Sequence, residues 1–256
     1  MIAKSKTDIE NLREAGKRMK QVVDAVLAAV HPGVPSMELE RVAREATERV
    51  GGVPSYLGYT DSGDKGTRKP YPAALCVSVN NEIAHCPPTP TKILKAGDVV
   101  AIDFGLEYKG LFMDTAYTVG VGAVDKSAQN LIEGTRAALE AVIDAAKVGG
   151  TVGNIGATAQ KVAKQYKLSV VKDLRGHGVG AAVHEDPLVP NFGKAGEGDK
   201  LIEGMVLALE PIFAEGSGAM VDDADGFGYV TQDDSRAAHF EHTILITKDG
   251  AEILTA

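Results

Sequence analysis

Length, composition and charge exclude several classes of protein. The chain has 256 residues, 44% of them apolar, which suits one or two globular domains with a sizeable core. A net charge of −8 gives no reason to expect nucleic-acid binding, because that function needs a surplus of positive charge. No run of about 18 apolar residues occurs, so we expect no membrane span.

Cysteine content and the N-terminal segment favour the cytoplasm. Cys76 and Cys86 are too few for a disulfide framework, which fits a reducing compartment. Residues 1–17 lack the apolar stretch of a secretory signal peptide. We therefore expect a leaderless cytoplasmic protein without a membrane segment or specific DNA binding.

Two helices are predicted at the start of the chain. Thr7 and Glu10 have the spacing of a capping box, with Thr7 as the N-cap. Apolar residues then recur at helical spacing until His31-Pro32-Gly33 ends the helix. Ser36 is predicted to cap a second helix that runs to Gly51-Gly52.

The middle of the chain is predicted to be irregular at first and then to form strands. Residues 53–72 show no periodicity, and the charged, glycine-rich segment 60–70 is expected to be an exposed loop. Strands are expected near 74–80 and within 98–119.

The remaining chain is predicted to begin with helices and to end in strands. Two helices at about 127–148 and 151–167 are separated by Gly149-Gly150. Residues 168–256 are rich in short apolar runs that read as strands.

One short sequence pattern occurs twice. The segments 96–103 and 203–210 read AGDVVAID and EGMVLALE, each with a glycine, an apolar strand and then a carboxylate. A duplicated α/β unit would explain the match, since each half also has two helices followed by strands. Strands of this composition could equally look alike by chance.

A pair of acids gives the first indication of chemistry. Asp103 and Asp114 lie on the two arms of a predicted β-hairpin, VVAIDFGLEYKGLFMDTAYTVG. A turn centred on Tyr108-Lys109 would place them directly opposite each other, with Cβ atoms about 5 Å apart. Two like charges repel there unless one is protonated or a cation lies between them, and a metal ion is the leading candidate.

Three more residues complete a candidate metal centre. His177 lies in RGHGVG, where the glycines allow the backbone to bend and a ligand to approach. Glu210 ends an apolar strand, and Glu241 in HFEHTILIT shares a strand face with apolar groups. Isolated buried carboxylates would protonate instead of staying charged, so a cation is expected nearby.

The five residues together favour a centre with two divalent ions. Four acids and one neutral imidazole carry a charge of −4, which two such ions neutralise. Oxygen donors with one nitrogen suit Mn, Fe, Co or Zn, and two ions could activate a water and polarise a carbonyl. Taken singly, an Asp in a hairpin is usually a turn or edge residue, and His177 could merely cap a turn.

The chain resembles the type I methionine aminopeptidases, metallopeptidases of the pita-bread fold. The resemblance runs from about residue 7 to the C-terminus and is carried by the motifs VAIDFG, GLFMDTAYTVG, GHGVGAAVHEDP, LEPIF and FEHTILIT. The stretch between His177 and Glu210 is too short for the helical insert of the type II enzymes.

The resemblance implies an α/β (α+β) fold with a curved antiparallel sheet covered by helices. It implies one catalytic domain, 1–256, with pseudo-symmetric halves at about 7–125 and 126–256. The site would lie in the centre, and a monomer is expected. The implied reaction is hydrolysis of the first peptide bond of nascent polypeptides, which releases the initiator methionine.

The resemblance also implies a role for each proposed ligand of two divalent ions, which could be Co, Mn, Fe or Zn. Asp114 and Glu241 would bridge both ions, and Asp103 would hold one of them. His177 and Glu210 would complete the other, and Glu210 would also be the general base for the attacking water.

Two further histidines match catalytic residues of the family. His85, in VNNEIAHCPP, would contact the substrate near the scissile amide. His184, in AAVHEDP, would stabilise the carbonyl oxygen as charge develops there.

The expected pocket for the methionine side chain is less typical than the metal centre. Tyr59, Tyr71, Cys76, Val183 and Phe227 match substrate-binding positions, but Val183 replaces a usual aromatic and Phe227 a common Trp. About nine extra residues separate the two tyrosines, and HCPP replaces HGIP. We favour the interpretation that the pocket still selects methionine over the interpretation that its selectivity is altered. Cys76 is expected to be a buried apolar residue, although a reactive thiol would also fit.

Two other functions remain as alternatives. An Xaa-Pro aminopeptidase or prolidase would use the same five ligands, but these enzymes usually carry an additional N-terminal domain. A non-catalytic ribosome- or RNA-binding protein of this fold would be expected to lose ligands. A transient ribosome contact is also possible through basic residues near the N-terminus, which otherwise form a solvated helix face: Lys4, Lys6, Arg13, Lys17, Arg18 and Lys20.

Overall fold

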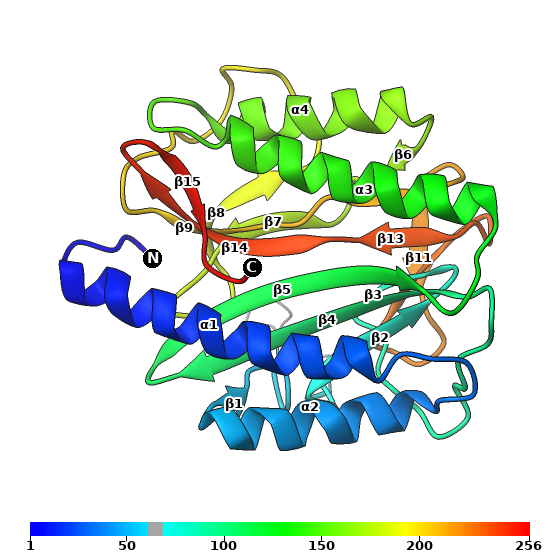
Figure 1. The fold of residues 1–256 in the computed structure, drawn as a ribbon. Helices are drawn as coiled ribbons and strands as arrows, with labels where there is room; N and C mark the ends of the chain where they lie inside the picture. Colours follow the sequence, from blue (N-terminus) through cyan, green and yellow to red (C-terminus); the bar gives the residue numbers. More distant parts are fainter. Residues whose placement is uncertain (61–68) are drawn as a thin grey trace.

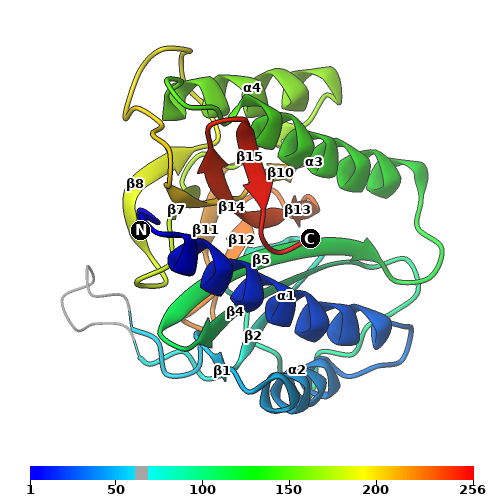
Figure 2. The same cartoon turned by 60° about the vertical axis from the view of Figure 1, so that its left-hand side comes forward.

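The computed structural model describes residues 1–60 and 69–256. Within these residues the chain forms four α-helices and one large, curved antiparallel sheet with two small sheets beside it. Helices α1 and α2 lie along one half of the large sheet, and α3 and α4 along the other (Figure 1 and Figure 2). Most of the loop expected at 60–70 lies outside the described residues.

Helix α1 spans Lys6–Ala28 and begins two residues earlier than expected. Its capping box is formed by Ser5 and Asp8, so the prediction for Thr7 and Glu10 is wrong. The Ser5 hydroxyl accepts a hydrogen bond from the Asp8 amide at 3.1 Å, and the Asp8 carboxylate accepts one from the Ser5 amide at 2.9 Å. The earlier acceptor pair satisfies the free amides, which leaves Thr7 inside the first turn.

Helix α2 spans Ser36–Val50, and Pro35 is its N-cap. Ser36 is not the predicted cap, because its hydroxyl is used in a tertiary contact. It donates to the Thr89 carbonyl at 3.0 Å and accepts from the Thr89 amide at 2.9 Å. Gly51 ends the helix in the left-handed region with φ of 69°, a conformation that glycine adopts at little cost.

The second helix pair lies close to its predicted position. Helix α3 spans Lys126–Ala145 and α4 spans Val152–Gln165, with the predicted glycine pair between them. Asp125 caps α3 by accepting a hydrogen bond from the Ala128 amide at 2.8 Å. Their apolar faces pack on the half of the sheet that contains β9 and β14.

The large sheet has nine strands, and its order is symmetric about its centre. The order is β1-β4-β5-β14-β9-β7-β8, with β2 also paired to β4 and β15 to β14. Outward from the central β5–β14 pair, β4 and then β2 follow on one side, and β9 and then β7 on the other. The bounds are β1 Val53–Pro54, β2 Leu75–Val79, β4 Val99–Tyr108, β5 Leu111–Gly120, β7 Arg175–Gly178, β8 Glu185–Pro190, β9 Val206–Leu209, β14 Glu241–Thr247 and β15 Gly250–Ile253.

This order supports the idea of two related halves. The two repeated segments supply β4 and β9, which occupy equivalent places on either side of the centre. The boundaries of the halves stay a prediction. Strand β1 also corrects the prediction that all of 53–72 is irregular, since Val53 and Pro54 pair with β4.

Two three-stranded sheets border the large one. The first has the order β13-β10-β6 and the second β11-β12-β3. Their strands are β3 Glu82–Ala84, β6 Ser169–Val170, β10 Ile212–Ala214, β11 Met220–Asp222, β12 Tyr229–Thr231 and β13 Ala237–His239.

The β4–β5 hairpin has a different register from the predicted one. Asp103 pairs with Ala116, and Asp114 pairs with Gly105, so the two acids are diagonal neighbours and not directly opposite. The turn is formed by Lys109-Gly110, whose φ angles are 53° and 77°. A two-residue hairpin turn of this kind needs left-handed residues, and glycine at its second position meets that need.

Candidate active site

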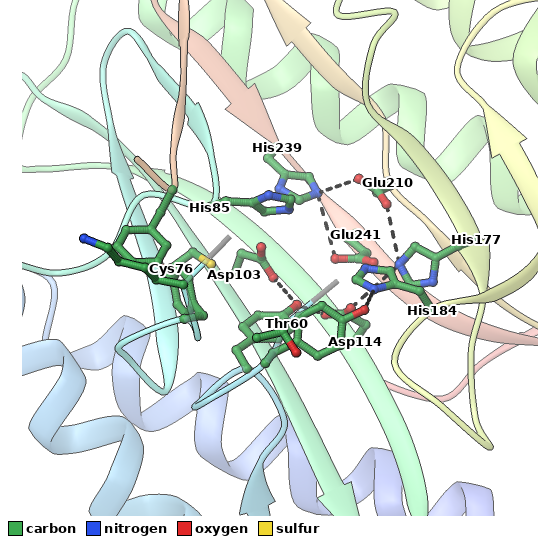
Figure 3. A pocket seen from close by; sticks show the side chains of 15 residues that line it. Thr60, Cys76, His85, Asp103, Asp114, His177, His184, Glu210, His239 and Glu241 are labelled. Carbon is green, nitrogen blue, oxygen red and sulfur yellow. Dashed lines mark hydrogen bonds and ion pairs between the residues drawn. The ribbon is translucent and has the colours of Figure 1, made fainter. Parts of the chain in front are cut away.

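One pocket collects side chains from both halves of the chain (Figure 3). The five proposed metal ligands and both proposed catalytic histidines line it. Of the predicted site residues only Val183, itself buried, is absent from the lining that the described residues form. The lining consists of Tyr56, Tyr59, Thr60, Lys69, Tyr71, Cys76, His85, Asp103, Asp114, His177, His184, Glu210, Phe227, His239 and Glu241.

Four carboxylates come together from four places in the large sheet. Asp103 lies on β4, Asp114 on β5 and Glu241 at the start of β14, while Glu210 directly follows β9. Burial raises the pKa of Asp103 to about 6. Burial, and then the charge of Asp103, raise the pKa of Asp114 well above its usual range.

The two glutamates share this environment. Burial, followed by the charge of Asp114, raises the pKa of both Glu210 and Glu241. Among the described residues, Oε1 of Glu241 is buried without a hydrogen-bond partner. Such a cluster is stable in its charged form only with positive charge beside it.

His177 faces this cluster with one ring nitrogen. Its Nδ1 lies 2.9 Å from the Gly178 carbonyl oxygen, and donation there leaves Nε2 with a free lone pair. Burial lowers the pKa of His177 to about 3, so the ring is neutral. Nε2 lies 3.8 Å from Oδ2 of Asp114 and 3.7 Å from Oε1 of Glu210.

These separations fit atoms that share a cation. They are too long for hydrogen bonds. Two ligands bound at about 2.0–2.2 Å lie about 2.9–3.8 Å apart for bond angles of about 90–130°. Ligand atoms of Asp114, His177 and Glu241 all lie within 4.8 Å of one another. The donor set therefore fits a divalent metal ion.

The glycines beside His177 allow neighbouring strands to pack closely. A Cβ on Gly178 would lie 2.3 Å from the Asp186 carbonyl oxygen, and one on Gly176 would lie 2.4 Å from that of Ala208. His177 thus lies on strand β7, between β8 and β9. The glycines serve this packing, and the shift of the β7–β8 register between Gly176 and Gly178 fits the backbone bend that the sequence suggested.

Two threonines fix the relative position of β5 and β14. The Thr243 hydroxyl accepts a hydrogen bond from the Asp114 amide at 2.9 Å and donates to the Asp114 carbonyl at 2.8 Å. The Thr115 hydroxyl donates to the Glu241 carbonyl at 2.6 Å. These buried bonds hold the backbones of both acids in register.

Tyr56 belongs to the site and was missed by the sequence-based prediction. Its hydroxyl lies 2.7 Å from Oδ1 of Asp103 and also hydrogen-bonds Asp114. Gly105 makes room for the ring, since a Cβ there would lie 2.7 Å from Cε1 of Tyr56. A glycine inside the strand, two residues after Asp103, was the available signal.

His239 was missed as well. It ends β13, is only 3% exposed, and points toward the carboxylates (Figure 3). Its Nε2 lies 3.6 Å from Oε2 of Glu210 and 3.8 Å from Oε2 of Glu241. Burial lowers its pKa to about 3. The available signal was its place two residues before Glu241, the spacing of side chains on one face of a strand.

The two predicted catalytic histidines line the same pocket as the proposed metal ligands. The His184 ring lies 4.4 Å from the His177 ring, and its Nδ1 lies 2.6 Å from the Tyr59 hydroxyl. His85 has a left-handed backbone with φ of 59°, an uncommon conformation for a residue other than glycine. Its ring lies 5.6 Å from that of Tyr229.

The apolar wall of the same pocket consists of Tyr71, Cys76 and Phe227. The ring of Tyr71 lies 5.8 Å from that of Phe227 in an edge-to-face arrangement. The thiol of Cys76 is buried, and burial raises its pKa well above the usual range. It is therefore un-ionised and unsuited to act as a nucleophile. Thr60 and Lys69, both exposed, also line the pocket.

Known proteins resemble the chain over its whole length. Residues 10–248 match the model of metallopeptidase family M24. A methionine aminopeptidase of Aquifex aeolicus is 42% identical, and the match covers 98% of this chain and 97% of that protein. Methionine aminopeptidase 1 of Bacillus subtilis is 36% identical, with 100% of this chain and 99% of that protein covered.

Solved structures confirm the expected pita-bread fold. The methionine aminopeptidase of Thermotoga maritima is 40% identical with a TM-score of 0.93, and the match covers 100% of this chain and 99% of that one. The prolidase of Pyrococcus furiosus is 23% identical with a TM-score of 0.74, and 65% of it is covered, which is a likeness in fold alone. None of the described helices is long and apolar enough to cross a membrane.

Proposed function

The chain belongs to metallopeptidase family M24, and from this we propose that it is an aminopeptidase that removes the initiator methionine from nascent proteins and peptides. The observation that carries the proposal is the buried Asp114–His177–Glu241 cluster in a pocket with an apolar wall. The cluster supplies hydrolytic chemistry, and the wall supplies a site for an unbranched apolar side chain. Full-length similarity to proteins named methionine aminopeptidase supports the same reaction.

The proposed cofactor is a pair of divalent ions, drawn from Co, Mn, Fe and Zn. Asp114 and Glu241 would be shared by both ions, Asp103 would bind one, and His177 and Glu210 the other. When bound, such ions lower the pKa of water and polarise a carbonyl.

Glu210 is proposed as the general base. It directly follows β9, and each of its carboxylate oxygens faces an imidazole, Oε1 toward His177 and Oε2 toward His239. A carboxylate oriented in this way can accept a proton from the attacking water and deliver it to the leaving amine.

His184 is proposed to stabilise the negative charge that develops on the substrate carbonyl oxygen. The Tyr59 hydroxyl lies 2.6 Å from Nδ1 of His184, and donation from the hydroxyl would place the ring proton on Nε2. Nε2–H is then a hydrogen-bond donor for the developing oxyanion. His85 is proposed to contact the substrate near the scissile amide, from a different wall of the same pocket.

The methionine side chain is proposed to bind against Tyr59, Tyr71, Cys76 and Phe227. All four line the pocket, and Cys76 contributes as a small buried apolar group. Val183 is buried outside the lining, so it would act on the substrate only by supporting the adjacent His184. This arrangement favours retained methionine specificity.

A peptide comparison tests the proposed substrate. The metal-loaded protein is offered Met-Ala-Ser and an Ala-Pro peptide in the presence of Mn or Co. We expect free methionine from the first peptide and little cleavage of the second. Preferential cleavage of the Ala-Pro peptide would favour the prolidase alternative. Absence of metal uptake together with tight RNA binding would favour the non-catalytic alternative.

The wider setting follows from the same proposal. We propose one catalytic domain over residues 1–256 that acts as a monomer in the cytoplasm, where nascent chains emerge. The free thiols Cys76 and Cys86 fit a reducing compartment. Three of the N-terminal basic residues have acidic partners, which favours a solvated helix face over ribosome contact: Arg13–Glu252, Arg18–Glu14 and Lys20–Asp24.

A further inference from the structure

His239 is a buried imidazole to which the proposed reaction assigns no role. It is 3% exposed, and both ring nitrogens lack a hydrogen-bond partner among the described residues. Buried polar atoms in native proteins almost always have a partner, and unpaired ones often mark a missing water or ion. The ring lines the pocket and points toward the carboxylates, as His177 does (Figure 3).

The distances around His239 match those around His177. Nε2 of His239 lies 3.6 Å from Oε2 of Glu210 and 3.8 Å from Oε2 of Glu241. Nε2 of His177 lies 3.7 Å from Oε1 of Glu210 and 3.8 Å from Oδ2 of Asp114. Both sets are too long for hydrogen bonds and lie in the range of about 2.9–3.8 Å for two ligands of one cation.

Glu210 lies between the two imidazoles. Its Oε1 faces His177 and its Oε2 faces His239, so one carboxylate offers an oxygen toward each ring. Oε2 of Glu241 lies 3.8 Å from Nε2 of His239, and Oε1 of the same carboxylate has no hydrogen-bond partner among the described residues. The surroundings of His239 therefore offer oxygen donors, and the ring offers a nitrogen.

We propose that His239 is a further metal ligand of this centre, bound through Nε2 on the side of Glu210 Oε2. The centre would then hold two imidazoles, His177 and His239, which face different oxygens of Glu210. The inference rests on the proposed dimetal site. Because imidazole suits Zn and Fe while carboxylates suit Mn, a second nitrogen donor shifts the metal preference toward Zn and Fe.

X-ray absorption at the zinc edge tests the ligand directly. The protein is loaded with two equivalents of Zn, and imidazole ligands are counted for the wild type, His239→Gln and His242→Gln. His242 is the matched control, because it lies three residues away, outside the pocket lining, with Nδ1 2.9 Å from the Thr255 hydroxyl. We expect two imidazoles per two ions in the wild type and in His242→Gln, and one in His239→Gln.

Calorimetric titration with Zn and Mn supplies an independent measurement. His239→Gln should weaken one of the two Zn-binding events by at least about tenfold. This is the lower end of the roughly 10–100-fold loss of metal affinity that follows when residues around a bound metal are mutated. Mn binding should weaken less, and His242→Gln should bind both ions as the wild type does. A single imidazole in wild-type protein, or unchanged Zn affinity in His239→Gln, would overturn the proposal.

The outcomes separate this inference from the proposed function. Wild-type protein that releases methionine but contains one imidazole refutes the role of His239 alone. Wild-type protein that contains two imidazoles but releases no methionine refutes the proposed function alone. The wild-type ligand count stands even if His239→Gln does not fold, which circular dichroism reveals.

Discussion

The hydroxyl of Tyr56 lies 2.7 Å from Oδ1 of Asp103, inside the buried carboxylate cluster. The same hydroxyl also contacts Asp114, although a phenol has only one proton to donate. Tyr56 therefore donates one hydrogen bond that the two buried acids share. The contribution of Tyr56 to stability should be greatest in the metal-free protein, because no cation then neutralises the carboxylates.

Tyr56→Phe should lower the stability of the metal-free protein. Removing the donor leaves buried carboxylate oxygens without a partner, which costs about 1–3 kcal/mol. Urea unfolding in the presence of a chelator measures the change. Tyr117→Phe is the control, since it removes a hydroxyl whose hydrogen bond to the Thr255 carbonyl is long, at 3.4 Å. Equal stability of Tyr56→Phe and wild type would contradict the assigned hydrogen bonds.

Asp114→Asn should abolish methionine release while the fold is kept. Asp114 is proposed to bind both ions, and an amide is a much poorer ligand than a carboxylate. We expect activity to fall by at least about 100-fold, the order of magnitude for loss of a group that stabilises charge in the reaction. Asp24→Asn, on the exposed face of α1, controls for the loss of one negative charge. Wild-type activity in Asp114→Asn would rule out the bridging role.

Removing the metal should lower the melting temperature. A ligand that binds only the folded state stabilises it by about 2.7 kcal/mol at a concentration 100 times its Kd. Differential scanning calorimetry with Mn and then with excess chelator measures the shift. The shift should be absent in Asp114→Asn, and a metal-independent melting temperature in the wild type would argue against a resident metal site.

Asp125 should contribute to stability in a defined range of acidic pH. A hydrogen bond from Arg236, 2.9 Å from Oδ2, lowers the pKa of Asp125 to about 2 from its usual 3.8. Because the folded-state pKa is the lower one, this contribution is present above pH 4 and is lost as the pH falls from about 4 to about 2.

Asp125→Asn tests this pH dependence, because asparagine keeps the N-cap of α3 but does not titrate. The free energy of unfolding, measured by urea at several pH values, should fall less steeply below pH 4 in the variant. Arg236→Gln should have the same effect on the slope. Parallel curves for the wild type and both variants would show that this ion pair does not affect acid stability.

Phe227→Ala should weaken methionine binding more than it slows the reaction. Its ring packs edge-to-face on that of Tyr71 in the apolar wall, and it is not one of the proposed metal ligands. Changes of apolar fit in a pocket are worth about 1–3 kcal/mol, so kcat/KM for Met-Ala-Ser should fall about tenfold or more, mainly through KM. Phe192→Ala is the control, since Phe192 is 37% exposed and outside the pocket lining. Unchanged KM would show that this wall does not bind methionine.

The hairpin shows where local sequence information ends. Alternation and apolar runs correctly placed Asp103 and Asp114 on adjacent strands, because both strands lie within one short segment. The register was wrong, since the turn is formed by Lys109-Gly110 and not by Tyr108-Lys109. The difference changed two directly opposed acids into diagonal neighbours, and left Gly105 opposite Asp114 with room for Tyr56.

The sequence by itself determined the residue types of the site and the approximate bounds of the four helices, because both depend on motifs and periodicity within short segments. Tertiary structure alone decided which distant side chains share the pocket. Tyr56 reaches Asp103 from 47 residues away, and His239 lies near Glu210 because β13 pairs with β10, the strand that follows Glu210 in the chain. Strand order and packing create these contacts, and no local pattern encodes the distance between segments that are far apart in the chain.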